Sequence, residues 1–319
     1  MKNVTIGFSI HRPEILLLTA ELMARHAVIF LEEPPDSHFK KMLARKMGVD
    51  DYLMRMDLEY PEFSRGMCRL ERELYQKGKT LIQTDPFVEV LVLIHEEFAR
   101  GKGPQDLEKN TMRHVVYQAE RNATGALLHF YKTSMTGTFK EVVSSVRQFA
   151  RADAARLRLR DSLRAQDIAR HAKNYRSIYI EAGMIHYGLW LRIRQQLKDF
   201  HKATPIFLDR MALQESASPQ HCYSPGDQLT LAYVFHPALS RNRWESLLAA
   251  RSIVYSKIVQ KEEHHDSGDP FFHLKDERNC ICMAKMLSMA DCEYLYPRIR
   301  HQPTNHAFAT VQDYIQSRK

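Results

Sequence analysis

The stretches VTIGFSIH at residues 4–11 and IYIEAGMIH at residues 178–186 decide the fold that the sequence predicts. Each is a short run rich in β-branched and aromatic residues that ends at a turn bearing a histidine. Short apolar runs of this kind are typical of strands buried inside a parallel sheet. We therefore expect His11 and His186 to stand where two such strands run into helices.

Similar runs recur along the chain, with helical patterns between them. They lie at residues 28–31, 80–84, 205–208 and 229–235. Between the first two strands, residues 14–26 repeat apolar positions at helical spacing, which favours a crossover helix. This alternation predicts an α/β fold with a largely parallel β-sheet flanked by helices.

The middle and the end of the chain differ from this pattern. Residues 87–175 contain no strand-like run and have apolar residues at helical spacing, which predicts a long helical insertion. Further helices are expected at 139–175, 189–197 and 242–260, and a polar break at 262–269. We predict one α/β core domain, residues 1–235, with the insertion at about 87–175. Residues 236–319 would form a helical and irregular C-terminal extension packed on that core.

Composition points to a globular, cytoplasmic protein. The 319 residues are 44% hydrophobic and 26% charged, and the apolar runs are far shorter than the roughly 18 to 20 residues needed to cross a bilayer. The N-terminal residues lack the pattern of a signal peptide. Five cysteines without a regular framework indicate reduced thiols. We therefore expect no membrane partner.

The formal charge of +8 favours some association with polyanions. The densest basic stretch, residues 151–176, has acidic residues interleaved with its arginines. That pattern is typical of a solvated helix with many ion pairs rather than of a nucleic-acid-binding arm. We do not expect nucleic acid as a partner.

Residues after the strands form the pool for a functional site, because ligands of open parallel sheets bind beyond the carboxyl ends of the strands. The pool contains two histidines, several carboxylates and a serine: Ser9, His11, Glu14, Glu32, Glu33, Asp85, Glu181 and His186. This set suits a histidine that acts as general base toward water beside an orienting carboxylate. It also suits a divalent metal site, with His11, His186 and Glu33 as ligands, or Glu32 in place of Glu33.

Several of these residues also have a structural interpretation. Glu14 follows Pro13 and favours the start of a helix, so we expect it to be structural unless it joins the site. Glu32 and Glu33 are adjacent, so in an extended chain only one of them can enter a given site. Asp85 precedes Pro86 and could equally cap the next helix. His186 lies near a helix N-terminus, which favours a neutral or metal-bound imidazole.

Other patterns are absent or weak. No glycine-rich dinucleotide or P-loop motif occurs, and no Gly-x-Ser-x-Gly elbow. The C-terminal region holds metal-capable residues without zinc-like spacing, for which we favour a polar loop: His264, His265, Asp266, His273, Cys280, Cys282 and Cys292.

The stretch GFSIHRPE at residues 7–14, followed by VIFLEE at 28–33, resembles the opening of the erythromycin esterase, TraB and ChaN-like (Tiki) superfamily. A second match is RDSLRAQDIA at 160–169, which leads into the 178–186 strand and its Gly-x-x-His turn. The resemblance covers residues 1–235, with a divergent helical middle. Phe8 departs from the esterase branch, which has a glutamate there, and phenylalanine can neither take a proton nor bind a metal.

The resemblance implies an α/β fold whose strand ends carry histidines and glutamates. Some proteins of this group hydrolyse esters or peptides, and others bind haem or have regulatory roles. It implies His11 as the water-activating or ligand histidine, with Glu32 or Glu33 as its acidic partner. His186 would be the second histidine, Arg160 a site-facing cation and Asp161 a structural residue.

Our leading hypothesis is a hydrolase-like protein with a strand-end His/Glu site, acting on an ester or amide of a small molecule or peptide, with or without a divalent metal ion. The alternatives are a non-catalytic binder of a small molecule or haem, and an interaction protein that uses the basic helical insertion. The sequence leaves the oligomeric state open.

Overall fold

A five-stranded parallel sheet forms the centre of the fold, as the sequence predicts. The computed structural model describes residues 2–56, 58–197, 201–213, 223–263 and 268–318. Its strands are β1 (Lys2–Ser9), β2 (Val28–Leu31), β3 (Thr80–Gln83), β4 (Ser177–Gly183) and β5 (His201–Phe207). Their order in the sheet is β3-β2-β4-β1-β5, and every neighbouring pair is parallel. The protein therefore belongs to the α/β class, with a helical insertion and C-terminal helices.

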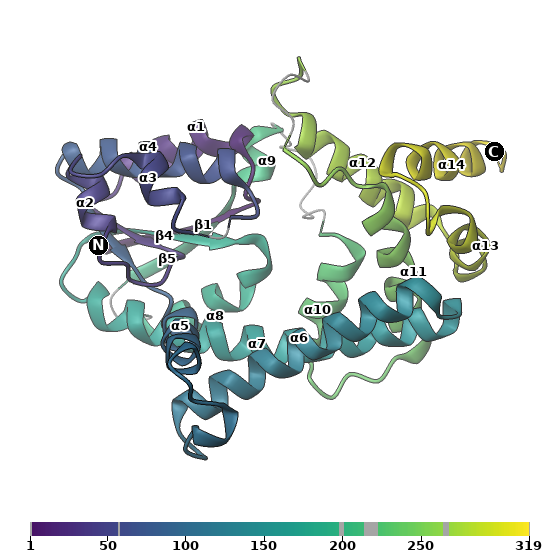
Figure 1. Ribbon diagram of the computed structural model, residues 1–319. Helices are drawn as coiled ribbons and strands as arrows, with labels where there is room; N and C mark the ends of the chain where they lie inside the picture. The colour runs from purple at the N-terminus through teal and green to yellow at the C-terminus, as the bar shows by residue number, and fades with distance from the viewer. Residues whose placement is uncertain (1, 57, 198–200, 214–222, 264–267, 319) are drawn as a thin grey trace. The chain divides into compact units, whose positions relative to one another are not determined.

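The helices follow in chain order (Figure 1). In the first half they are α1 (Leu16–Ala24), α2 (Phe39–Leu43), α3 (Val49–Leu53), α4 (Pro61–Gln76), α5 (Pro86–Ala99), α6 (Met112–Thr136) and α7 (Phe139–Ala172). In the second half they are α8 (Tyr187–Gln196), α9 (Leu208–Ala212), α10 (Pro225–Phe235), α11 (Asn242–Ile258), α12 (Phe272–Met286), α13 (Met289–Ile299) and α14 (Thr304–Gln316). Short 3-10 turns are η1 (Pro13–Ile15), η2 (Pro104–Asp106) and η3 (Met184–His186).

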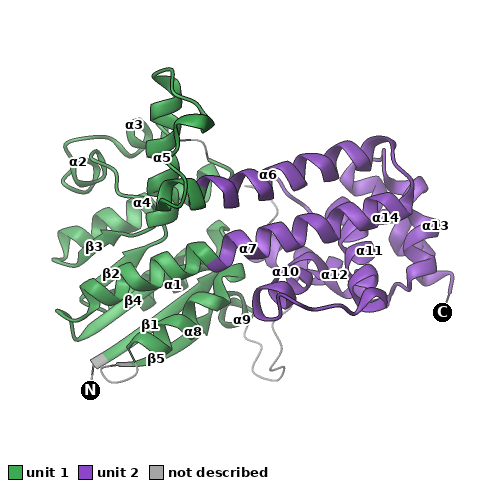
Figure 2. Cartoon of the chain, turned by 90° about the horizontal axis from the view of Figure 1, so that it is seen from below, with its two compact units in different colours: residues 1–116, 159–217, 263–270 green, residues 117–158, 218–262, 271–319 purple. Residues whose placement is uncertain are grey.

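The chain divides into two compact units, shown in green and purple in Figure 2. Unit 1 contains residues 1–116, 159–217 and 263–270, and so holds the whole sheet. Unit 2 contains residues 117–158, 218–262 and 271–319, and its described elements are helical. This division differs from the predicted domains, which end the core at residue 235, because much of the insertion groups with the C-terminal helices.

One face of the sheet packs on the second part of α7 and on α8, while α1 and α4 lie on the opposite side (Figure 1). Side chains alternate between the two faces of a strand, so every second residue points to α7 and α8. The buried residues of this face are Val4, Ile6, Phe8, Val28, Phe30, Ile178, Ile180 and Ala182, which pack on Ala165, Ile168, Ala172, Leu189, Ile193 and Leu197. Phe8, which departs from the esterase pattern, is thus a core residue.

Residues 229–235 form part of helix α10, so the strand predicted there is wrong. Pro225 occupies the first turn, and Ser224 accepts a hydrogen bond from the Asp227 N–H at 3.1 Å. These two start signals override the β-branched composition of the run. The region beyond Phe271, expected to be partly irregular, consists mainly of three helices, α12 to α14.

Within the described ranges, no helix combines the length and the apolar character that a membrane span requires.

Gly7 tests how closely the face under α1 and α4 is packed. A Cβ on Gly7 would lie 1.8 Å from the Tyr179 hydroxyl and 2.5 Å from its ring carbon Cζ. We expect Gly7→Ala to lower the free energy of unfolding by about 1–3 kcal/mol, because a buried ring must move. Chemical denaturation measures this loss.

The matched control is Gly125→Ala in α6, where a Cβ would meet no atom within 4 Å. This change should raise stability by roughly 0.5–1 kcal/mol, because alanine favours the helix interior. Equal effects of the two substitutions would contradict the packing described for Gly7.

Candidate functional site

The carboxyl ends of β1, β2 and β4 bring both predicted histidines to one place. These strands are neighbours, and Gly183 is the last residue of β4. From the position that a Cβ on Gly183 would take, His186 Cδ2 lies at 3.6 Å, Glu32 Oε2 at 3.8 Å and His11 Nε2 at 4.0 Å. The glycine therefore leaves a small space that two imidazoles and a carboxylate share.

The Glu32 carboxylate is the most heavily bonded group of this site. Its Oε1 lies 2.9 Å from His186 Nε2 and 3.1 Å from Arg160 Nη2. Its Oε2 accepts the Gly183 N–H at 2.6 Å and lies 3.3 Å from Arg164 Nη1. Burial alone would raise the pKa of Glu32, but His186 and the two arginines outweigh it and hold the pKa well below its usual range. Glu32 is therefore a fixed anion at neutral pH.

His186 bridges Glu32 to a second carboxylate, that of Asp161 in α7. The distance from His186 Nδ1 to Asp161 Oδ1 is 2.6 Å, and both side chains are buried. Burial would lower the pKa of His186, but the charges of Glu32 and Asp161 raise it to about 9. The sequence favoured a neutral or metal-bound imidazole at this helix start. Two carboxylates outweigh the helix N-terminus, so His186 is a cation.

Among the three cationic side chains around Glu32, Arg160 has the most access to solvent, with 24% of its side chain exposed, against 4% for His186 and 1% for Arg164. Its Nε and Nη2 donate to Asp85 Oδ2 at 2.7 and 2.5 Å. Its Nη1 lies 3.4 Å from His186 Nε2. A protonated His186 cannot accept that bond, so Nη1 is a donor that a ligand can use. Asp85 also caps α5 by accepting the Val88 N–H at 3.2 Å, so its two predicted roles coexist.

Arg164, one helical turn further along α7, joins the helix to the sheet. Its Nε donates to the Thr84 carbonyl at 2.9 Å and its Nη2 to the Glu181 carbonyl at 2.6 Å. The side chain is 1% exposed. We expected the arginines of this stretch to be solvated, so this expectation is wrong for Arg164.

The sequence analysis missed the site roles of Asp161 and Arg164, although it contains a signal for them. The apolar positions Ala165, Ile168 and Ala172 face the core at helical spacing. One turn earlier the same face carries Asp161 and Arg164. Charged residues at core-facing positions of a helix require buried partners, which marks a polar site.

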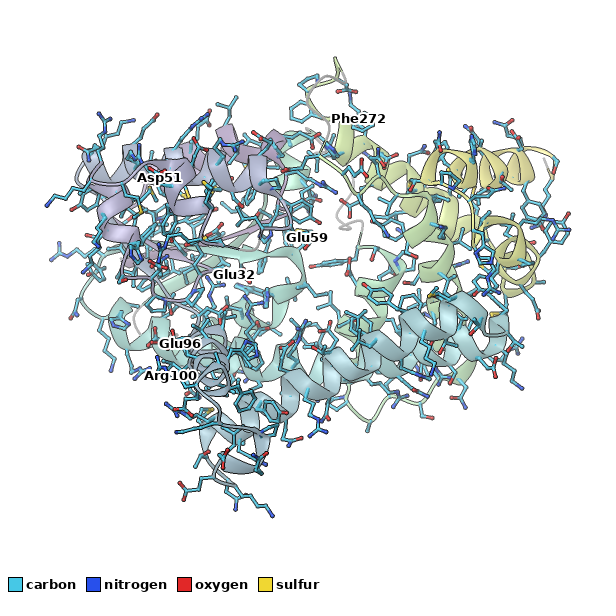
Figure 3. The ribbon with its side chains drawn as sticks, viewed as in Figure 1. Glu32, Asp51, Glu59, Glu96, Arg100 and Phe272 are labelled. Atoms are coloured by element: carbon cyan, nitrogen blue, oxygen red, sulfur yellow. The ribbon has the colours of Figure 1, made fainter. Side chains whose placement is uncertain are left out.

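His11 lies beside aromatic rings at the edge of the site. Its ring stacks on Phe63, with centroids 5.1 Å apart, and meets Tyr60 edge-on at 6.4 Å. Burial lowers the pKa of His11, and the charges of His186 and Arg160 lower it further. Glu32 and Glu59, both labelled in Figure 3, oppose this effect only in part. His11 is therefore a neutral imidazole at pH 7.

Glu33 lies outside this cluster. Its Oε2 accepts a hydrogen bond from Gln83 Nε2 at 2.8 Å, and its pKa is raised by burial. Of the two adjacent glutamates, Glu32 is therefore the one that lies beside His186. Glu14 lies in the η1 turn behind Pro13, at the predicted helix start.

The residues present do not fit the predicted divalent metal site. Both ring nitrogens of His186 are bonded to carboxylates, and Glu33 is directed away. Glu32 faces two guanidinium groups, whose charges oppose a second cation. In keeping with this, no group of three or more His, Cys, Asp or Glu within the described ranges is arranged to hold a metal ion.

The described residues of the predicted C-terminal cluster lie in helices, where a polar loop was expected. Buried His273, Cys280 and Cys292 belong to helices α12 and α13, whereas residues 264–266 and Cys222 lie outside the described ranges.

The arginines of the predicted basic stretch in α7 have acidic or carbonyl partners. Arg156 pairs with Asp153 and Glu120, and Arg170 pairs with Asp167. Arg158 donates to the Tyr233 carbonyl.

Comparison with known proteins adds one relative. A protein of Archaeoglobus fulgidus, described as uncharacterized, is 24% identical over 288 residues, which cover 90% of this chain and 95% of the relative. No protein-family model matches the chain, and no solved structure matches it. The similarity therefore spans both units but carries no activity with it.

The Asp161–His186 bond predicts a specific pH dependence of stability. The pKa of His186 is raised from 6.5 to about 9, so its contribution is fully present below pH 6.5 and is lost as pH rises through 9. Asp161→Asn should lower the free energy of unfolding by about 3–5 kcal/mol at pH 6.5. Between pH 7 and 9.5, the free energy of unfolding of this variant should fall by less than that of the wild type.

Denaturant titrations across this range measure both effects. Asp153→Asn, in the same helix, provides the control, since its partner is Arg156 rather than a histidine. If Asp161→Asn and wild type lost stability in parallel above pH 7, the charged Asp161–His186 pair would be ruled out.

Proposed function

We propose that this protein is a hydrolase that acts on an ester or amide through water activated by His11. The observation that carries the proposal is the meeting of His11, Glu32 and His186 over Gly183, where one imidazole is neutral and the other charged. The pKa values of His11 and His186 are shifted in opposite directions, so at one pH the first can act as a base while the second is a fixed cation. The resemblance to esterase-like proteins agrees with this chemistry.

His11 is the general base in this mechanism. Its neutral ring takes a proton from a water molecule while that water attacks the carbonyl carbon of the substrate. The aromatic contacts with Phe63 and Tyr60 hold the ring plane. As the tetrahedral intermediate collapses, the protonated ring returns the proton to the leaving alcohol or amine.

Arg160 stabilises the negative charge that develops on the carbonyl oxygen. Its Nη1 is the donor left open by the protonated His186, and its Nε and Nη2 are fixed by Asp85 and Glu32. A donor held in place before the reaction stabilises an oxyanion without reorganisation. His186 and Asp161 position Glu32, which in turn orients Arg160.

The experiment is a hydrolysis screen with p-nitrophenyl esters, lactones and amide substrates. We expect His11→Asn to lower kcat/KM by at least about 10²-fold, the usual contribution of a general base. The control is His95→Asn, an exposed histidine in α5. The proposal fails if the wild type hydrolyses none of these classes, or if His11→Asn retains full activity.

A pH profile follows from the two histidines. Activity should rise with pH on a limb below 6.5, because the pKa of His11 is lowered and the base must be neutral. It should fall near pH 9, where His186 loses the charge that fixes Glu32. The measurement is log(kcat/KM) from pH 4.5 to 10, and an acid limb midpoint above 6.5 would contradict the assignment of His11.

Gly183→Ala tests the shared space without removing any functional group. The added methyl would stand 3.6–4.0 Å from His186, Glu32 and His11, at ordinary contact distance, so the fold should be retained. Because the methyl fills the space where water and substrate meet, we expect activity to be lost while the thermal midpoint stays within about 3 °C. An active variant would place the reaction elsewhere.

A further inference from the structure

A second polar cluster lies on the opposite face of the sheet, beneath helix α4. Glu33 and Glu181 share this face because side chains alternate along β2 and β4, and Glu71 enters it from α4. Glu71 is 1% exposed and Glu181 is 8% exposed. We call Glu33, Glu71 and Glu181 the carboxyl cluster.

Three polar atoms near these side chains have no hydrogen-bond partner among the described residues. They are Glu71 Oε2, Tyr179 Oη and Ser9 Oγ, from side chains at most 4% exposed. Tyr179 Oη is placed over Gly7, which pairs with Glu181 in the sheet, and Ser9 follows two residues later on the same face. Buried polar atoms normally have partners, so this group of exceptions requires an explanation.

The charged groups around the cluster do not neutralise it. Arg164 from α7 donates to the Glu181 carbonyl and pairs with Glu32 on the other face. Arg72 from α4 donates to the carbonyls of Met42 and Met47. The other titratable groups that act on the cluster or on its neighbours are acidic or weakly acidic: Glu32, Asp36, Tyr52, Cys68 and Tyr179.

We propose that the carboxyl cluster is a proton-binding site that takes up solvent protons on folding and makes assembly of the Glu32 end of the sheet depend on pH. Buried carboxylates that repel one another and form no ion pair are destabilised, and protonation of one of them relieves both the burial cost and the repulsion. A proton on Glu71 removes the charge that burial destabilises and turns one of its carboxyl oxygens into a donor.

The link to the functional site runs through Glu181. Its Oε2 accepts the N–H of Glu32 at 3.2 Å, and its carbonyl accepts from Arg164, which pairs with the Glu32 carboxylate. Ionisation of Glu181 places a second negative charge beside Glu32 and Glu33. Ionisation also strengthens the bond from the Glu32 N–H, so the protonation state of Glu181 changes both the charge beside Glu32 and the hydrogen bond that holds its backbone.

The pKa directions agree with this arrangement. Burial and the charges of Glu33 and Glu181 raise the pKa of Glu71 well above its usual range. Burial, with Glu33, raises the pKa of Glu181 to about 7. A carboxyl with a raised folded pKa binds more protons in the folded state, so stability falls as pH rises from 4.5 through 7.

The test compares the unfolding equilibrium constants of the wild type and Glu181→Gln from pH 4.5 to 8. Glutamine keeps an acceptor for the Glu32 N–H but cannot ionise. We expect the unfolding equilibrium constant of the wild type, divided by that of the variant, to rise by up to about tenfold per pH unit up to pH 7 and then to level off. Glu71→Gln should produce a similar rise that continues to higher pH. The control is Glu73→Gln, an exposed residue of α4, for which the ratio should stay constant.

A second measurement uses the wild-type protein alone, in case a variant fails to fold. Among the carboxyl ¹³C resonances of labelled glutamates, two should come from carboxyl groups that remain protonated above pH 6. The proposal is overturned if all glutamates titrate below pH 5.5, or if the variants and the wild type change in parallel. It is also overturned if Mg²⁺, Ca²⁺ or Mn²⁺ stabilises the wild type but not Glu71→Gln and Glu181→Gln, because the cluster would then bind a cation. These readouts need no substrate, so they are independent of the proposed hydrolysis.

Discussion

The buried ionic bonds of Glu32 are the constraint on which the rest of the site depends. A carboxylate that is 7% exposed carries a large desolvation cost, and His186, Arg160, Arg164 and the Gly183 N–H together offset it. Each of these partners is tied in turn to a different part of unit 1. The network thereby fixes the second part of α7 against the ends of β2 and β4.

The alternation of side chains along a strand separates two kinds of chemistry. Glu32 points to the face covered by α7 and meets three cationic side chains, so it stays ionised. Glu33, one residue later, points to the face covered by α4, where it has no cationic partner among the described residues and burial raises its pKa. One dipeptide therefore places a carboxylate with a lowered pKa on one side of the sheet and a carboxyl with a raised pKa on the other.

Much of the fold was predictable from the sequence, because buried parallel strands and amphipathic helices leave local patterns. Strand β2 was predicted with its observed bounds, and the strands that lead to His11 and His186 within a few residues. Residues 229–235 were predicted wrongly because their β-branched composition was weighed above the Ser-Pro helix start just before them. Composition is the weaker signal where a cap is present.

The site was predictable only in part, since the sequence identifies residues at strand ends but not their partners. It suggested His11, His186 and one of two glutamates, and the geometry selects Glu32. The roles of Asp161 and Arg164 depend on how α7 docks, through hydrogen bonds between residues that are 17 to 80 positions apart along the chain. The charge of His186 depends on the same docking, so no local pattern could give it.

The central claim is that one site holds a neutral His11 beside a cationic His186, and ¹⁵N NMR of the histidine rings tests it most directly. In the wild-type protein at pH 7.5, we expect one ring with both nitrogens protonated, assigned to His186 through its loss in His186→Gln. The His11 ring should show the nitrogen shifts of a neutral imidazole at that pH. If both rings are neutral at pH 7.5, or if both titrate together near pH 6.5, the account of this site is wrong.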